Sequence, residues 1–340
     1  MEYTRLGSSG LKISKVILGT MSFGSPKWMG WILPEENALP ILKHAYDSGI
    51  NTFDTADVYS HGVSEQILGN FLRKYDIQRS KVVIMSKVCC EVVEDETQPP
   101  LNLTNDGEAV NQCGLSRKHI LDAAEASVKR LGTYIDVFQI HRLDRDVPMK
   151  EIMGTLNEVI EKGWVRYIGA SSMAAWEFQM LQNVAKEHGW HQFISMQNYH
   201  NLLYREEERE MLPYCKATGV GIIPWSPLAR GALARPWSKT HDSARDSSDV
   251  WMEAIVRAGQ GNPDKTVVDR VEELAEKKGV KMAQVAVAWS LKKEVNPILG
   301  LMSAERIDEA VGALKVELTE REMKYLEEPY IPKLIQAVAY

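Results

Sequence analysis

The chain has 340 residues, 44% hydrophobic and 25% charged, a composition typical of a globular protein. The net charge of −6 argues against nucleic acid or an anionic membrane as the main partner, and no stretch approaches the roughly 18 apolar residues of a membrane span. The four cysteines lack metal-ligand and disulfide spacing and the N-terminus lacks an apolar signal core, so we expect a cytoplasmic protein with reduced thiols and no metal.

Short apolar segments alternate with longer amphipathic segments along the chain. Residues 2–14 are expected to form a β-hairpin that covers the bottom of the fold. Buried strands are predicted at 14–19, 50–54, 81–87, 135–141, 165–172, 193–198, 220–226 and 296–300. Amphipathic helices are predicted at 117–131, 150–162, 205–218 and 267–278. Left-handed helix ends are expected at Gly49, Gly163, Gly189, Gly219 and Gly279.

Eight strands that alternate with helices, without an obvious linker, predict one α/β domain over residues 1–340. The expected fold is a single (β/α)8 TIM barrel with an N-terminal β-hairpin. The alternative is a doubly wound open sheet, which is expected to carry a G-x-G-x-x-G turn that this sequence lacks. Two long βα loops, at about 91–114 and 234–263, and a C-terminal tail at about 320–340 depart from the alternation.

Polar residues stand at the carboxyl ends of the predicted strands, which meet at one mouth in a parallel barrel. Asp54, Lys87 and His141 end three successive strands, and Tyr59 follows the first of them by five residues. At any single position, the commoner explanation of a polar residue is that the strand ends there because it meets water. The four residues together fit one task, which is to exchange a proton with a carbonyl or alcohol oxygen.

Tyr59 holds the proton in this hypothesis. A free tyrosine has a pKa of about 10, which is too high for ready exchange near neutral pH. The ammonium of Lys87 is expected to lower this pKa, Asp54 to keep the lysine charged, and His141 to hold the carbonyl oxygen near the phenol. Because none of these groups supplies a hydride, a nicotinamide cofactor is required.

Six motifs, F-D-T-A-D-V-Y, I-M-S-K, Q-I-H-R-L-D, I-G-A-S-S-M, M-Q-N-Y-H-N and P-W-S-P-L-A-R-G, resemble the aldo-keto reductase superfamily in order and spacing over roughly residues 3–315. The chain is most similar to the fungal and bacterial group of aryl-alcohol dehydrogenases and versiconal hemiacetal acetate reductases. This resemblance implies a (β/α)8 barrel and NADPH-dependent reduction of aldehydes or ketones. It places a catalytic tetrad at Asp54, Tyr59, Lys87 and His141.

The resemblance also implies how NADPH is held. The carboxamide would be hydrogen-bonded by Ser171, Ser172 and Gln197, although many relatives carry Asn in place of Ser172. Trp225 would stack on the nicotinamide ring; its alternative role is barrel packing. The adjacent ribose would lie over Gly19, Thr20 and Met21, with Asp54 also in contact with the cofactor. The pyrophosphate would be lined by Ser226, Pro227, Leu228, Arg230 and Gly231.

The adenosine end is expected at residues 298–310. Ser303 is predicted to cap a helix that starts at Ala304, and Arg306 in its first turn suits the 2′-phosphate, which favours NADP over NAD. A solvated surface arginine is the alternative. Glu309 matches relatives, but Gly300 and Leu301 replace a Lys-Ser pair, and Ala310 replaces an adenine-contacting Asn, so a looser preference for NADP stays open.

The substrate is expected to be a small-molecule carbonyl compound. Trp28 and Trp31 in the first βα loop indicate an aromatic or hydrophobic substrate, although shielding of the barrel edge explains them equally well. Met21, Cys89 and the apolar C-terminal residues are further candidates for the pocket. Arg142 either binds an acidic group of the substrate or pairs with Asp144.

Other functions stay open at this stage. NADP-dependent alcohol oxidation uses the same groups in reverse. A cofactor-binding regulatory subunit, resembling potassium-channel β subunits, shares the fold, but the complete tetrad argues against it. A lyase without a nicotinamide leaves Ser171, Gln197 and Trp225 unexplained. A monomer or weak homo-oligomer and a role in secondary metabolism are expected.

Overall fold

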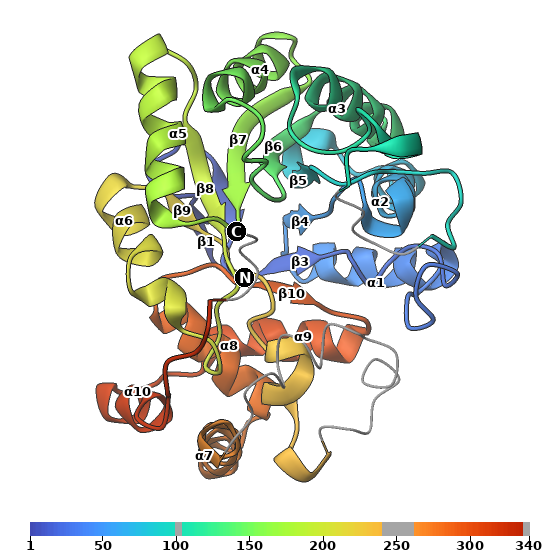
Figure 1. Cartoon of the computed structure of the whole chain (residues 1–340). Helices are drawn as coiled ribbons and strands as arrows, with labels where there is room; N and C mark the ends of the chain where they lie inside the picture. The colour runs from blue at the N-terminus through green and yellow to red at the C-terminus, as the bar shows by residue number, and fades with distance from the viewer. Residues whose placement is uncertain (99–103, 240–261, 336–340) are drawn as a thin grey trace.

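The computed structural model describes residues 1–98, 104–239 and 262–335. Eight parallel strands form one sheet, and helices surround it (Figure 1). In sheet order the strands are β10 (Ile298–Gly300), β3 (Ile17–Gly19), β4 (Thr52–Asp54), β5 (Val83–Val88), β6 (Ile135–Ile140), β7 (Val165–Ser171), β8 (Phe193–Gln197) and β9 (Gly221–Ile222). The helices are α1 (Glu35–Asp47), α2 (Val63–Lys74), α3 (Arg117–Leu131), α4 (Met149–Glu161), α5 (Ala175–His188), α6 (Met211–Thr218), α7 (Asn262–Lys278), α8 (Met282–Lys292), α9 (Ala304–Gly312) and α10 (Glu320–Glu327).

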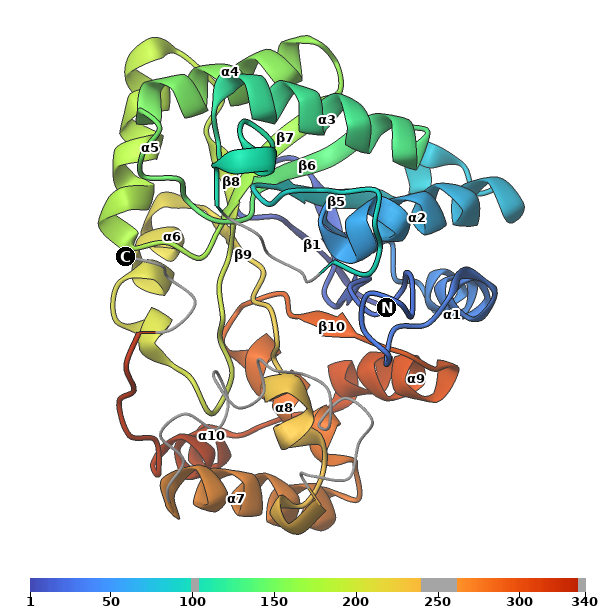
Figure 2. The ribbon, with the colours of Figure 1, turned by 45° about the vertical axis from the view of Figure 1, so that its right-hand side comes forward.

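The two edge strands of the sheet, β9 and β10, meet and close the barrel. Trp225 and Ile298 form a parallel bridge, and the Ile298 N–H donates to the Pro224 carbonyl at 2.9 Å. Closure leaves no open edge, so the predicted (β/α)8 TIM barrel is confirmed and the open-sheet alternative is wrong. Helices α7 and α10 lie outside α8, away from the strands (Figure 2).

The N-terminal hairpin covers the bottom of the barrel, as predicted. Strand β1 (Tyr3–Arg5) pairs antiparallel with β2 (Lys12–Ser14). The turn between them contacts the start of β9, where the Ser8 N–H donates to the Gly219 carbonyl at 2.7 Å. Buried apolar side chains from the hairpin and the barrel strands, including Leu6 and Ile13, pack into one cluster there.

Two helix starts differ from the prediction. The helix expected at 205–218 begins at Met211, because Pro213 is tolerated in a first turn but would clash with a preceding carbonyl deeper in a helix. Residues Glu206–Glu208 form a 3₁₀ turn instead. The helix expected at 267–278 begins earlier, at Asn262, with Pro263 again in the first turn.

The strand expected at 220–226 shortens to Gly221–Ile222, because Pro224 has no N–H for the sheet. The five predicted left-handed glycines all have positive φ, from 65° to 89°. Among the helices of the described residues, none has both the length and the apolar character that a membrane crossing needs.

The long loops and the tail are only partly described. Residues 99–103 of the first loop, 240–261 of the second and 336–340 of the tail lie outside the described residues. The first loop contains a 3₁₀ turn at Gly107–Ala109, and α7 begins inside the second. Much of the predicted tail is in fact helix α10, which Thr319 caps by accepting from the Glu322 N–H at 3.3 Å.

Candidate active site

The carboxyl ends of β4 and β5 bring Asp54, Lys87 and Tyr59 into direct contact. Lys87 Nζ donates to Asp54 Oδ1 at 2.5 Å, to the Thr55 carbonyl at 2.8 Å and to the Tyr59 phenol oxygen at 3.2 Å. The lysine is fully buried and Asp54 is 2% exposed. The three donors of the ammonium therefore have three acceptors, and its charge is compensated inside the protein.

Burial and charge act in opposite directions on these two groups. Burial lowers the pKa of Lys87, but the Asp54 carboxylate and the Tyr59 hydroxyl raise it by more, so the lysine stays charged. Burial raises the pKa of Tyr59, Lys87 lowers it, and Asp54 raises it, with a net rise. The expectation that Lys87 brings the Tyr59 pKa below its ordinary value is therefore wrong, because burial prevails. Tyr59 is protonated near neutral pH.

The second carboxylate oxygen of Asp54 is held by two amides. Asp54 Oδ2 accepts from Gln139 Nε2 at 3.1 Å and from Gln197 Nε2 at 2.9 Å. Gln197 also donates to Gln139 Oε1 at 3.1 Å. The prediction missed Gln139, although it stands two residues before His141 on β6, and alternation places both side chains on one face of the strand.

His141 lies beside the phenol. The rings of Tyr59 and His141 are edge to face, with centroids 6.0 Å apart. Burial lowers the pKa of His141 well below its ordinary value, and the charges of Arg142 and Lys87 lower it further. Its Nδ1 is buried without a hydrogen-bond partner among the described residues. A neutral imidazole has one donor nitrogen, which suits contact with a carbonyl oxygen.

The backbone after Tyr59 takes a rare conformation that places the phenol over the barrel mouth. Ser60 and His61 both have φ of 49°, and Gly62 has φ of 92°. Ser60 Oγ accepts from the Ser25 N–H at 3.1 Å, which fixes the turn to the first βα loop. Left-handed non-glycine residues persist only where surrounding contacts determine them. Ser64 and Glu65, in the first turn of α2, supply such contacts.

Ser64 holds the ends of β3 and β4. Its hydroxyl donates to the Thr20 carbonyl at 3.0 Å, accepts from Thr55 Oγ1 at 3.0 Å, and lies 2.9 Å from Thr20 Oγ1. All three residues are fully buried. The Thr20 N–H also donates to the Asp54 carbonyl at 2.8 Å, which holds Thr20 beside Asp54.

Glu65 connects α2 to β5 and α3. This fully buried carboxylate accepts from Arg130 Nε at 2.6 Å and from the hydroxyl of Ser86, the residue before Lys87. Gly62 leaves room for this arginine, since a Cβ there would lie 2.5 Å from Arg130 Cδ. We call Glu65, Ser86 and Arg130 the clamp. It ties the turn after Tyr59 to the strand that carries Lys87.

The residues predicted to contact the nicotinamide come together at the ends of β7 to β9. Ser171 Oγ donates to the Gln197 carbonyl at 2.8 Å, and Trp225 Nε1 donates to Ser172 Oγ at 3.2 Å. The half-buried Trp225 ring stacks on Tyr199 with centroids 4.5 Å apart. Through Gln197 this group contacts Asp54, so it borders the tetrad.

The segment after Trp225 has an unusual backbone. Ser226, Ala229 and Arg230 have φ of 51°, 47° and 55°, and Gly231 has φ of 104°. Left-handed residues next to right-handed ones can direct N–H groups into a concavity that suits phosphate, and here the Ala229 and Gly231 N–H groups donate within the turn, to the Ser226 and Leu228 carbonyls, each at 2.9 Å. The predicted pyrophosphate residues Pro227 and Leu228 lie within this segment. The Asn201 amide holds it by donating to the Ser226 carbonyl at 3.0 Å.

The pattern described as the aldo/keto reductase family matches residues 15–331. The chain belongs to the aldo/keto reductase family. It is 60% identical to versiconal hemiacetal acetate reductase of Aspergillus parasiticus, over 98% of both chains. It is 54% identical to the Schizosaccharomyces pombe protein named "Putative aryl-alcohol dehydrogenase C977.14c", over 98% of this chain and 97% of the relative. It is 49% identical to the aldo-keto reductase dtxS3 of Metarhizium robertsii, over 99% and 93%.

Family and relatives confirm the resemblance found in the sequence. This aldo/keto reductase is an oxidoreductase that acts on carbonyl or alcohol groups, and enzymes of its family generally use a nicotinamide cofactor.

The residues predicted to bind the adenosine begin on the strand next to that of Gly19, which is predicted to border the ribose. Gly300 on β10 is the register partner of Gly19 on β3. Ser303 caps α9 as predicted, with its hydroxyl accepting from the Arg306 N–H at 3.3 Å. The exposed Arg306 and the half-buried Glu309 line a pocket of about 380 Å³. The pocket also contains Lys281 and three further carboxylates, Glu272, Glu276 and Glu305.

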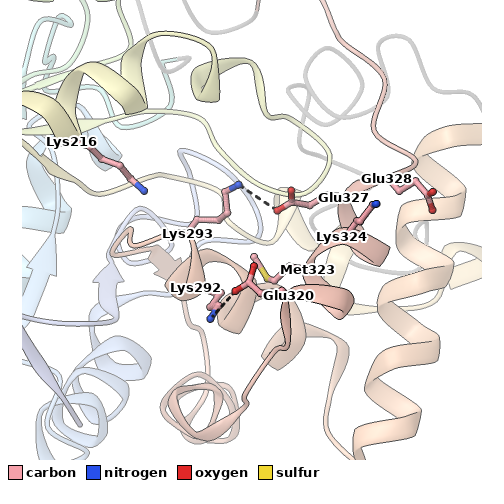
Figure 3. A pocket seen from close by; sticks show the side chains of 8 residues that line it. All are labelled: Lys216, Lys292, Lys293, Glu320, Met323, Lys324, Glu327 and Glu328. Atoms are coloured by element: carbon pink, nitrogen blue, oxygen red, sulfur yellow. Dashed lines mark hydrogen bonds and ion pairs between the residues drawn. The ribbon is translucent and has the colours of Figure 1, made fainter.

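A second pocket, of about 520 Å³, lies among α6, α8 and α10 (Figure 3). Its charged groups largely neutralise one another, since Lys292 pairs with Glu320 and Lys293 with Glu327. None of its lining residues stands at a strand end that carries the candidate site. We assign it no role in the reaction.

The predicted substrate residues fall into two groups. Trp28 and Trp31, each 6% exposed, form one apolar cluster with Met21 and Tyr59. Cys89 is buried at the end of β5, and Arg142 follows His141. By contrast, the described part of the C-terminal segment exposes its apolar side chains, with Ile331, Leu334 and Ile335 at 56%, 87% and 58%.

The ion pair considered between Arg142 and Asp144 is absent from the structure. Asp144 Oδ2 instead accepts from the Leu115 N–H at 2.9 Å, and Oδ1 accepts from the Asp146 N–H at 3.1 Å. The carboxylate thus serves the turns before α3 and α4.

Proposed function

We propose that this aldo/keto reductase reduces an aldehyde or ketone, with an aromatic or hydrophobic body, to the alcohol with NADPH, and that Tyr59 is the general acid. One observation carries the proposal: a buried, charged Lys87 joins the Asp54 carboxylate to the Tyr59 phenol through hydrogen bonds of 2.5 and 3.2 Å. This arrangement stabilises the phenolate that forms when Tyr59 gives up its proton.

The chain's residues fit a nicotinamide cofactor. Ser171 and Ser172 place two hydroxyls beside Trp225, whose ring is already stacked and half-buried, and the left-handed turn at 226–231 suits a pyrophosphate. When bound, the reduced cofactor supplies a hydride to the carbonyl carbon. Gly19, Thr20 and Met21 border the same mouth.

Tyr59 donates its proton to the carbonyl oxygen as that oxygen gains negative charge. Because burial keeps the phenol protonated, the acid is ready before the hydride arrives. Lys87 then faces a phenolate, and Asp54, held by two amides, keeps the lysine in place. The neutral His141 offers a second hydrogen bond to the same oxygen, which fixes the carbonyl for attack.

We propose NADPH rather than NADH because Arg306 stands in the first turn of α9, next to the N-cap Ser303. The four carboxylates of the nearby pocket oppose a phosphate dianion, so the preference is expected to be moderate. Contacts of Gly300 and Glu309 with the adenosine belong to the same proposal.

Two relatives favour a second candidate direction. They are named as aryl-alcohol dehydrogenases, and the same residues serve NADP-dependent alcohol oxidation with Tyr59 as the base. A regulatory subunit is disfavoured because the tetrad is complete. We further propose one domain over residues 1–340, a cytoplasmic location, a role in secondary metabolism and a monomer or weak homo-oligomer.

The proposal is tested by following NADPH absorbance with a panel of aryl and aliphatic aldehydes. Tyr59→Phe is expected to lower turnover by roughly 10²- to 10⁴-fold, as for loss of a general acid, with NADPH affinity nearly unchanged. Tyr75→Phe, which removes the hydroxyl of the residue that follows α2, is the matched control and should match wild type. Equal turnover in both variants would overturn the assignment of Tyr59.

A further inference from the structure

Arg142 is a largely buried cation that has no counterion among the described residues. It directly follows His141 at the end of β6. Its Nη1 donates to the His141 carbonyl at 2.7 Å, and this is its only hydrogen bond among the described residues. No carboxylate within those residues forms an ion pair with it, and Asp144 is engaged elsewhere. Buried charges are normally paired, so this one requires an explanation.

The remaining nitrogens of the guanidinium, Nε and Nη2, are available. Neither makes a hydrogen bond within the described residues, yet neither is among the buried polar atoms sealed from solvent. They are therefore accessible to solvent. The Nε and Nη2 groups form one edge of the planar guanidinium, and such an edge is suited to a carboxylate or another acidic oxygen.

Arg142 lies at the candidate site, directly after His141. The guanidinium is close enough to Tyr59 to lower the pKa of the phenol and close enough to His141 to lower that of the imidazole. The nearby Cys90 thiol is a poor counterion, because a hydrogen bond with Cys89 and burial raise the pKa of Cys90 well above its ordinary value. Asp54 neutralises Lys87, but in the part of the chain that the structure describes no carboxylate pairs with Arg142.

We propose that Arg142 binds a second, acidic oxygen of the substrate, so that the preferred substrates are carbonyl compounds that also carry a carboxylate or an ionised phenol. This inference rests on the proposed carbonyl reduction. The carbonyl occupies the space between Tyr59 and His141, and the acidic group reaches the guanidinium beside it. The tryptophan cluster then contacts the apolar body between the two oxygens.

A purely positioning role for Arg142 makes a different prediction. If the side chain only held the His141 carbonyl, its removal would slow all substrates equally, whatever their charge. A substrate-binding role instead changes the ratio between a charged substrate and its neutral analogue. The comparison must therefore be made between substrates in the same variant.

The test measures kcat/KM with NADPH for 4-carboxybenzaldehyde and for its neutral match, methyl 4-formylbenzoate. A third arm uses 4-hydroxybenzaldehyde above and below the pKa of its phenol, which separates a phenolate preference from a carboxylate preference. Wild type, Arg142→Met and Arg142→Lys are compared. Arg166→Met, which removes an exposed arginine at the opposite end of the barrel, controls for the change in overall charge.

Wild type is expected to prefer the acidic aldehyde over the neutral one, and Arg142→Met to lose about 10- to 100-fold of that preference while still reducing the ester. Arg142→Lys should keep part of the preference, and Arg166→Met all of it. Equal losses for charged and neutral aldehydes, or no preference in wild type, would overturn the inference and leave the proposed reduction intact. If wild type reduces no aldehyde, the proposed function fails and this inference with it.

Discussion

Replacement of Lys87 by methionine tests the electrostatic basis of the site. The substitution keeps the length of the side chain but removes a charge that lies 3.2 Å from the Tyr59 oxygen. At an effective dielectric constant of about 20, unit charges at that separation attract by about 5 kcal/mol. This attraction exists only when the phenolate forms, so its loss raises the barrier rather than weakening substrate binding.

The expected result is a fall in kcat of about 10³-fold with a small change in KM, measured by NADPH absorbance. Lys87→Met also leaves the Asp54 carboxylate buried without its cation, which is expected to reduce the free energy of unfolding by about 3–5 kcal/mol. Lys81→Met, an exposed lysine just before β5, is the matched control and should change neither quantity.

The double variant Asp54→Asn/Lys87→Met separates the two effects. It removes the unpaired carboxylate, so urea denaturation should show much of the lost stability restored, whereas kcat should stay low. A Lys87→Met enzyme whose kcat lies within threefold of wild type, while the protein remains folded, would refute the idea that this cation stabilises the phenolate.

Three further substitutions test separate parts of the account. Glu65→Gln weakens the clamp, so kcat should fall about tenfold with unchanged NADPH affinity, whereas the exposed Glu36→Gln should have no effect; a normal kcat would contradict a positioning role. Arg306→Ala should raise KM for NADPH about tenfold but not KM for NADH, and equal changes would exclude a 2′-phosphate contact. Burial raises the pKa of Glu207 to about 7, so the folded state favours its acid form and stability is lost as pH rises from about 4.5 through 7. Glu207→Gln should therefore stabilise the protein at pH 8, by up to about 3 kcal/mol, and hardly at pH 5; equal gains in urea denaturation at both pH values would contradict the raised pKa.

The sequence predicts that Asp54, Tyr59, Lys87 and His141 lie together, because three of them end strands. Asp54, Lys87 and His141 each follow a buried apolar segment, and a parallel barrel brings all such ends to one mouth. Gln139 could have been predicted in the same way, because it stands on β6, two residues before His141. Its partner Asp54 is 85 positions away in the sequence. Pro213 likewise indicates that α6 starts later than the predicted residue 205.

Other features depend on contacts between distant parts of the chain. Glu65 and Arg130 are 65 positions apart on neighbouring outer helices, and neither stands at a strand end, so no local pattern indicates the clamp. The pKa of Tyr59 depends on the sum of burial and three charges, and its direction follows only from their positions in space. That Asp144 pairs with the Leu115 N–H rather than with Arg142 also follows only from positions in space.

The most direct measurement of the central claim is the rate of a single turnover in which pre-bound NADPH is mixed with excess aldehyde in a stopped-flow instrument. With NADPH binding matched between proteins by fluorescence titration, Tyr59→Phe should transfer its hydride roughly 10²- to 10⁴-fold more slowly than wild type. A variant that oxidises NADPH at the wild-type rate in that first turnover would show that the phenol beside Lys87 does not deliver the proton.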